Sequence, residues 1–151
     1  MNIKGYAIQP GAALPEADLS GSDLSKVDLT GADLSRANLR GVLLRGALLR
    51  EANLQGADLS GSVLGGASLI QARLSRAILR GANLTGADLQ QASLDRTDLR
   101  GANLTGVNLA RATLREAYLR AADLTEANLD EADLTDADLT GATMPDGSVH
   151  G

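Results

Sequence analysis

The stretch from Gly81 to Leu109 reads GANLTGADLQQASLDRTDLRGANLTGVNL and repeats its pattern every five residues. Every fifth residue in it is leucine, and a small residue, most often alanine, stands two positions before each leucine. Asp or Asn usually lies between the two, as at Asn83 and Asp88. The register continues without insertion or deletion, with leucine at every fifth position from Leu14 to Leu139 and Met144 in the next place. Such a fixed period decides the fold before local propensities are weighed.

A period of five suits neither an α-helix nor a flat strand. On a helix each step of five residues turns the side chain by about 140° net, so the leucines would spiral around the surface. In a flat strand an odd period would send successive leucines to opposite sides. The leucines converge only if the chain turns one corner per repeat and winds around an axis. We therefore expect the small residue and the leucine to point inward, the Asp or Asn between them to point outward, and the coils to stack as in a β ladder.

The glycines indicate how many corners each coil has. Many precede the small residue, and most of these fall into two sets that step by twenty residues, namely Gly21, Gly41, Gly61, Gly81, Gly101 and Gly141, and Gly46, Gly66, Gly86 and Gly106. A second period of twenty predicts four repeats per coil and hence four faces. Glycine on two adjacent edges fits turns that need a positive φ, such as type II. The other two edges carry Lys, Arg, Gln or Glu, and we expect them to turn differently.

The repeated motif A(D/N)LxG resembles the pentapeptide-repeat family over about Ala17 to Met144, nearly the whole chain. This resemblance implies an all-β fold, a right-handed four-sided β-helix, here with about six and a half coils. The family often places Phe at the central position, whereas this chain has no Phe, so a narrow and uniform ladder of leucines is expected. We divide the chain into an N-terminal cap segment (1–13), the β-helix (14–144) and a short C-terminal tail (145–151), which we expect to be mobile.

The composition narrows the protein classes. With 151 residues the chain is long enough for one domain, and the absence of cysteine excludes disulfides and thiolate metal sites. The N-terminus lacks the apolar run of a secretory signal, and no stretch is long and apolar enough to span a membrane. We therefore expect a cytoplasmic protein, and the resemblance implies a bacterial one.

The net charge of −5 hides a strong pattern along the chain. Residues 17–34 and 121–146 are acidic, whereas the part between them holds twelve arginines against six acids. The sequence thus predicts a rod with negative ends and a positive middle. Acidic ends and a capping segment favour a monomer, because they oppose the stacking of one rod on another.

Two groups in the positive middle are candidate sites. By the twenty-residue rule one face carries a basic column, composed of Arg40, Arg80, Arg100 and Arg120. The other group replaces Asp or Asn by apolar residues at outward positions. Leu43 and Val63 stack on one face and Leu48 lies around the next corner, with Arg40, Arg45 and Arg50 in the same coil. An apolar centre with an arginine rim is typical of a protein-binding patch, although isolated exposed aliphatic side chains are also normal on protein surfaces.

No constellation for chemistry is apparent. The outward Asp and Asn residues could form a calcium ladder, but short polar side chains at a strand-to-turn junction more often bind neighbouring backbone groups. His150, the only histidine, lies in the tail without a partner, and no nucleophile–base pair or phosphate-binding loop can be assembled. We predict a protein that is not an enzyme and has no cofactor. Its acidic total charge and scarcity of aromatic residues disfavour direct nucleic-acid binding.

Two functional hypotheses follow. The first is a structural or scaffold protein that presents rigid faces to an unknown protein partner, with a regulatory role as one form of it. The second comes from the resemblance, since some family members imitate B-DNA in shape and negative charge and bind DNA gyrase, which they protect from quinolones or inhibit. This chain departs from such members in its positive middle, in its lack of a loop that interrupts the coils, and in its lack of an aromatic C-terminal segment.

Overall fold

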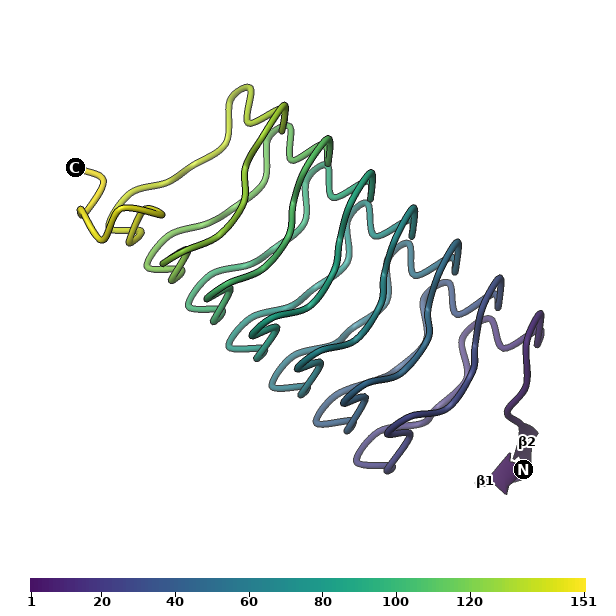
Figure 1. The fold of residues 1–151 in the computed structure, drawn as a ribbon. Helices are drawn as coiled ribbons and strands as arrows, with labels where there is room; N and C mark the ends of the chain where they lie inside the picture. The colour runs from purple at the N-terminus through teal and green to yellow at the C-terminus, as the bar shows by residue number, and fades with distance from the viewer.

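The computed structural model describes residues 1–151 as a rod of stacked coils (Figure 1). The only regular strands are β1 (Asn2–Ile3) and β2 (Tyr6–Ala7), which pair antiparallel at the N-terminal end. The rest of the chain winds in four-sided coils whose sides are too short to count as strands. None of the chain forms a helix, so the structure contains no helix able to cross a membrane.

The coils are joined by parallel β-bridges between residues that lie twenty positions apart, from Ala13 with Asp33 to Asp123 with Thr143. Each repeat contributes three backbone hydrogen bonds between coils. The leucine amide donates to the coil ahead (Leu74 to the Ser93 carbonyl, 2.7 Å), and the corner amide two residues later does so as well. The outward residue donates to the coil behind. These ladders satisfy most of the backbone polar groups that a coiled chain without helices would otherwise leave unpaired.

The core lies along the axis of the rod and contains the leucines and the small residues that precede them. From Leu19 to Leu124 every leucine of the period is at most 1% exposed, and the alanines that accompany them are almost as well buried. The side chains within each repeat therefore point as the sequence predicts. The expected uniform leucine ladder, without aromatic residues, is confirmed.

The outward Asp and Asn residues bind the backbone, as expected from their chemistry. In most repeats their Oδ1 accepts a hydrogen bond from the amide two residues later, as in Ser25 to Asp23 and Thr85 to Asn83, both 3.0 Å long. The bond fixes the chain as it enters each corner. No group of three or more acidic or histidine side chains is placed to share a metal ion.

The prediction that two of the four edges turn differently is wrong. At every corner the residue before the small one has a positive φ, with glycines near 65° and non-glycine residues such as Glu16 (60°), Arg36 (55°) and Gln91 (59°). Each of these corners is closed by a hydrogen bond from the amide of the small residue to a carbonyl three residues earlier, as in Ala37 to Leu34 at 3.1 Å. As far as Glu126, the amide of the positive-φ residue also donates to a carbonyl of the next coil, as in Arg36 to Gln55 at 2.8 Å. The repeated turn therefore holds non-glycine residues in a left-handed conformation that costs each of them about 1 kcal/mol.

The two ends of the rod differ. At the N-terminal end Ile8 is buried, Ile3 and Tyr6 pack against the core, and the first leucines are fully covered. At the C-terminal end the leucines of the last coil, Leu129, Leu134 and Leu139, remain partly exposed. The division into cap, β-helix and tail stays a prediction. The expected monomer also stays a prediction, and light scattering can test it.

The tail, for which the sequence predicts mobility, is hydrogen-bonded to the end of the rod in the structure. Thr143 and Val149 form an antiparallel bridge, and the amide of His150 donates to the carbonyl of Ala142 over 2.8 Å. In return the carbonyl of His150 accepts from the amide of Gly141. The last residues thus fold back on the end of the rod. Backbone groups on this end have no further coil to bind, so they are free to hold the tail.

One buried hydroxyl group gives a stability prediction. Ser62 lies at an inward position between Val42 and Ala82, and its Oγ has no hydrogen-bond partner. Replacing Ser62 with alanine should raise the free energy of unfolding by about 1 kcal/mol, because an unpaired buried hydroxyl is costly. Urea denaturation followed by circular dichroism measures the change.

Thr97 provides the control for this prediction. It lies at the same kind of inward position, but its hydroxyl donates to the carbonyl of Leu74 over 2.9 Å. Thr97→Ala should therefore lower the free energy of unfolding by about 1 kcal/mol. A loss of stability in Ser62→Ala would show that the hydroxyl of Ser62 has a partner.

Candidate functional site

The apolar group predicted from the sequence forms one surface around a corner of the rod. Leu43 forms a β-bridge with Val63 on one face, and Leu48 lies on the next face of the same coil as Leu43. Leu43 and Leu48 are 39% and 41% exposed, and Val63 is half-buried. We call these three residues the apolar patch. Each occupies an outward position at which most other repeats have a polar side chain.

Cationic side chains accompany the apolar patch. Arg45 lies on the corner between Leu43 and Leu48, Arg50 lies at the next corner, and neither has a carboxylate within ion-pair distance. The side chain of Lys26 lies on the same corner as Arg45, one coil nearer the N-terminus, and is also without an ion pair. Arg40, in contrast, contacts Asp58 at 3.2 Å.

The carboxylates nearest to the patch are already engaged. Asp23 and Asp28 lie one coil below Leu43 and Leu48, and their Oδ1 atoms accept the amides of Ser25 and Thr30. The pKa of Asp23 is lowered chiefly by the amide of Ser25. Both carboxylates stay ionised, and neither forms an ion pair with Arg45, so Arg45 is available to a partner.

The basic column is not a row of free cations. Arg40 pairs with Asp58, Arg80 and Arg100 both contact Asp98, and Arg120 contacts Asp138. The shortest of these contacts, Arg100 Nη2 to Asp98 Oδ2, is 2.6 Å, and hydrogen bonding by Arg100 is the largest cause of the lowered pKa of Asp98. The Arg100 guanidinium also lies 5.8 Å from the ring centre of Tyr118. The column therefore offers a partner less positive charge than its composition indicates.

Eight of the twelve arginines are in ion pairs, and the four without one are Arg45, Arg50, Arg73 and Arg76. Most of the pairs join residues 18 or 20 positions apart, which the coil of twenty residues brings together, as in Arg115 with Asp133 and Arg96 with Glu116. In the pairs at an offset of 18 the acid always lies ahead of the arginine, and none of the four has an acid 18 positions ahead or 20 positions away in either direction. This rule would have found Arg73 and Arg76, which the sequence analysis missed.

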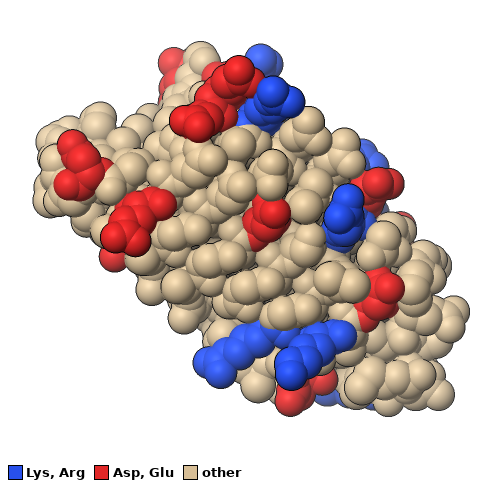
Figure 2. Space-filling view, viewed as in Figure 1, with Lys and Arg blue, Asp and Glu red and all other residues tan.

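The ion pairs also modify the predicted charge pattern. Arg111, Arg115 and Arg120 belong to the positive middle, but they bind acids of the following coil, Glu131, Asp133 and Asp138. The acidic end is therefore partly neutralised where it meets the middle. On the face in Figure 2, acidic side chains still stand alone at the C-terminal end, on the left, and basic side chains appear only farther along the rod.

His150 has no role that the structure identifies. Its backbone holds the tail in place, while the residue itself is exposed. The features that the structure does present are the apolar patch and an arrangement of charged side chains.

Comparisons with known proteins agree with this architecture. The family of pentapeptide repeats matches the chain in overlapping segments that together span residues 11–141. The chain is 29% identical to the pentapeptide repeat protein Rfr23 from the cyanobacterium Cyanothece 51142, with 85% of this chain and 84% of that one covered and a TM-score of 0.52. No curated protein matches it.

Two further solved structures are similar. HetL, a pentapeptide repeat protein involved in heterocyst differentiation regulation in the cyanobacterium Nostoc sp. strain PCC 7120, is 34% identical, with 93% and 86% covered and a TM-score of 0.36. A trypsin-treated QnrB1, a plasmid-mediated fluoroquinolone resistance protein, is 21% identical, with 97% and 80% covered and a TM-score of 0.51. The repeat, the four-sided coils and these matches lead to one conclusion: the chain belongs to the pentapeptide repeat family, whose members are right-handed quadrilateral β-helices.

Proposed function

We propose that this protein is a non-enzymatic scaffold that binds another protein through the apolar patch and its unpaired cations. The observation that carries the proposal is the coincidence of the two features. The only place where two adjacent faces both expose leucine, at Leu43 and Leu48, is also where Arg45 and Arg50 lack ion pairs. Burying the leucines supplies the affinity and the arginines orient an acidic partner.

The rod is well suited to this role because its surface is fixed by the coil. Every residue of the patch is tied to its neighbours by hydrogen bonds between coils, for instance Leu43 to Ser22 at 2.9 Å and Leu48 to Val27 at 2.9 Å. A surface fixed in this way loses little conformational entropy when a partner binds. The partner that fits is a protein with an apolar surface bordered by carboxylates. The location we propose for this interaction is the cytoplasm.

Replacing Leu43 and Val63 with aspartate should reduce capture of a partner from native lysate at least tenfold. The variant should fold, because Asp23 and Asp123 occupy the same position on that face in other coils. An aspartate there can accept the amide two residues later, as Asp123 accepts Thr125 at 3.0 Å.

The matched control is Asn83→Asp with Asn103→Asp, which adds the same charge to the same face. It should leave capture unchanged. Equal capture of a partner by all three proteins would refute the proposal that the apolar patch is the binding surface. If DNA gyrase subunits were captured equally by all three, the gyrase-directed alternative would replace the scaffold proposal, and attention would move to the acidic end.

A further inference from the structure

A second surface feature lies at a different corner of the rod and contains the other two unpaired arginines. The four faces are numbered along the chain by their outward residues, from Asp18 (first) through Asp23 and Asp28 to Asp33 (fourth). At the corner between the fourth and the first face, successive coils place Glu16, Arg36, Gly56, Arg76 and Arg96. Gly56 has no side chain, so a hollow remains between the side chains of Arg36 and Arg76. The hollow has a volume of about 520 Å³ and is lined by Ser35, Arg36, Asn53, Gln55, Ser75 and Arg76, with Gly56 between the arginines.

The lining of this hollow is polar and contains no carboxylate. Arg76 has no ion pair, and Arg36 has only a contact of 3.7 Å with Glu16, in which both side chains are largely exposed. Such an exposed pair is worth at most about 1 kcal/mol, so both guanidinium groups are available to a ligand.

Arg73 adds a third cation at the edge of the hollow. With the amide of Gln55 turned so that its oxygen faces the guanidinium, that oxygen accepts from Arg73 Nη2 at 2.8 Å and from Nε at 3.1 Å. Asp33 forms a β-bridge with Asn53 of the lining and accepts the amide of Ser35 at 3.0 Å. The pKa of Asp33 is lowered first by the bonds from Ser35, with smaller contributions from the charges of Arg36 and Arg73. Asp33 thus lies near two of the three cations, and Arg76 has no carboxylate within ion-pair distance.

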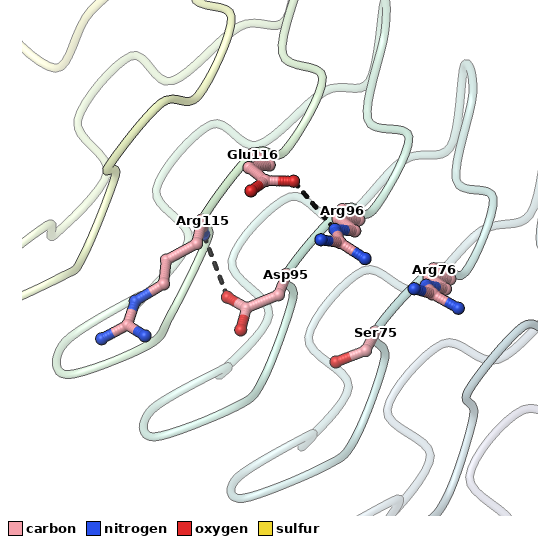
Figure 3. A pocket seen from close by; sticks show the side chains of 6 residues that line it. All are labelled: Ser75, Arg76, Asp95, Arg96, Arg115 and Glu116. Carbon is pink, nitrogen blue, oxygen red and sulfur yellow. Dashed lines mark hydrogen bonds and ion pairs between the residues drawn. The ribbon is translucent and has the colours of Figure 1, made fainter.

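The neighbouring hollow on the same corner differs from the first because its lining contains two acids (Figure 3). It has a volume of about 310 Å³ and is lined by Ser75, Arg76, Asp95, Arg96, Arg115 and Glu116. Arg96 Nε contacts Glu116 at 2.8 Å, and Asp95 accepts the amide of Arg115 at 3.0 Å. In the picture Arg76 is drawn without an interaction to either acid. Its charge is therefore not compensated on this side either.

We infer that the hollow at Gly56 binds a phosphate-type anion that engages two arginines at once. Guanidinium groups bind phosphate oxygens through paired hydrogen bonds, and hydroxyl and amide groups such as those of Ser35, Ser75 and Gln55 can complete the set of donors. Arg36 and Arg76 are two coils apart, roughly 9.6 Å at the spacing of a β ladder. This span suits a diphosphate better than a single phosphate.

The site is independent of the proposed scaffold function. The apolar patch surrounds the corner between the second and the third face, which is diagonally opposite the corner of Gly56 in a four-sided coil. A protein bound to the patch therefore leaves the hollow open. The double variant Leu43→Asp with Val63→Asp should bind the anion as the wild type does, so either proposal can fail without the other.

Isothermal titration calorimetry with inorganic pyrophosphate tests the site, at an ionic strength of about 0.01 M, where screening is weak. The wild type should bind with saturation and at least tenfold more tightly than it binds inorganic phosphate. Arg76→Gln should weaken pyrophosphate binding at least tenfold, and Gly56→Glu should abolish it. The backbone there accepts glutamate, because Glu16 and Glu116 adopt the same positive φ on this corner. Its Cβ would lie 3.1 Å from Arg36 Cγ, so the exposed side chain of Arg36 has to shift slightly.

The control variant is Arg111→Gln. Arg111 has the same left-handed conformation on another corner and is paired with Glu131 at 2.8 Å, so the variant makes the same change in net charge away from the hollow. It should bind pyrophosphate as the wild type does. The inference is overturned if the wild type gives no saturable binding, if Arg76→Gln binds like the wild type, if Arg111→Gln weakens binding as much as Arg76→Gln does, or if phosphate and pyrophosphate bind equally.

Discussion

Replacing Leu74 with alanine should lower the free energy of unfolding by about 3 kcal/mol, within the range for fully buried leucines. Leu74 has no exposed surface and lies in the middle of the rod, with a leucine of the same face in the coil on either side. The four-sided wall is held by hydrogen bonds between coils, so it cannot collapse onto the space that the side chain leaves. Urea denaturation followed by circular dichroism measures the loss.

The matched control is Leu134→Ala. Leu134 lies on the same face in the last coil, where its side chain is already partly exposed. Its replacement should cost about 1 kcal/mol, because less apolar surface is removed from the core. Stability in a repeat protein is approximately a sum of nearest-neighbour terms. The losses of unfolding free energy in Leu74→Ala and Leu134→Ala are therefore directly comparable. Equal losses in the two variants would contradict a core whose burial decreases towards the C-terminal end.

Thermal stability should fall steeply as the pH is lowered from about 4 to 2. The pKa values of Asp133 and Asp138 lie at about 2, below the ordinary 3.8. For Asp133 the largest cause is the hydrogen bond from the Thr135 hydroxyl, followed by that from Arg115. For Asp138 the hydroxyl and the amide of Thr140 precede Arg120.

The direction follows from which form of the carboxyl group the folded state prefers. Because the folded pKa is below the unfolded one, folding favours the ionised carboxylate, and its contribution is fully present above pH 3.8. That contribution is lost as the pH falls through the folded value of about 2. Other aspartates with lowered pKa values, such as Asp18 and Asp28, act in the same direction. Thermal unfolding at pH 6, 4, 3 and 2 measures the effect.

Asp133→Asn with Asp138→Asn should flatten this dependence on pH. Asparagine keeps the bond to the amide two residues later, as Asn128 does for Asp130 at 2.9 Å, but it does not titrate. The variant should therefore remain folded and lose less stability on acidification than the wild type. If the melting temperature of the wild type stayed constant between pH 4 and 2, the proposed contribution of these ionised aspartates to stability would be refuted.

Much of the candidate site could be predicted from the sequence because a coil of twenty residues makes distance along the chain equivalent to position on the surface. Leu43 and Val63 are twenty residues apart, and they meet in the structure as a β-bridge. The same rule applied to charges would have separated Arg76, which has Leu94 at the position 18 residues ahead, from Arg120, which has Asp138 there and pairs with it. What the sequence analysis lacked was this second offset, which depends on how far an arginine side chain reaches along the rod.

By itself, the sequence determined the period, the four-sided coil, the leucine core and the outward Asp and Asn bonds, because each follows from local spacing repeated without interruption. Only the tertiary structure decided three other features. Glu16 and Arg36 adopt the left-handed conformation that every corner of the coil requires, although residues of their type disfavour it. Val149 folds back because the last coil leaves backbone groups unpaired. Arg76 has no ion pair because no neighbouring coil places a carboxylate within reach of it. In all three cases the contacts between coils decide the outcome, and these outweigh the preference of any single residue.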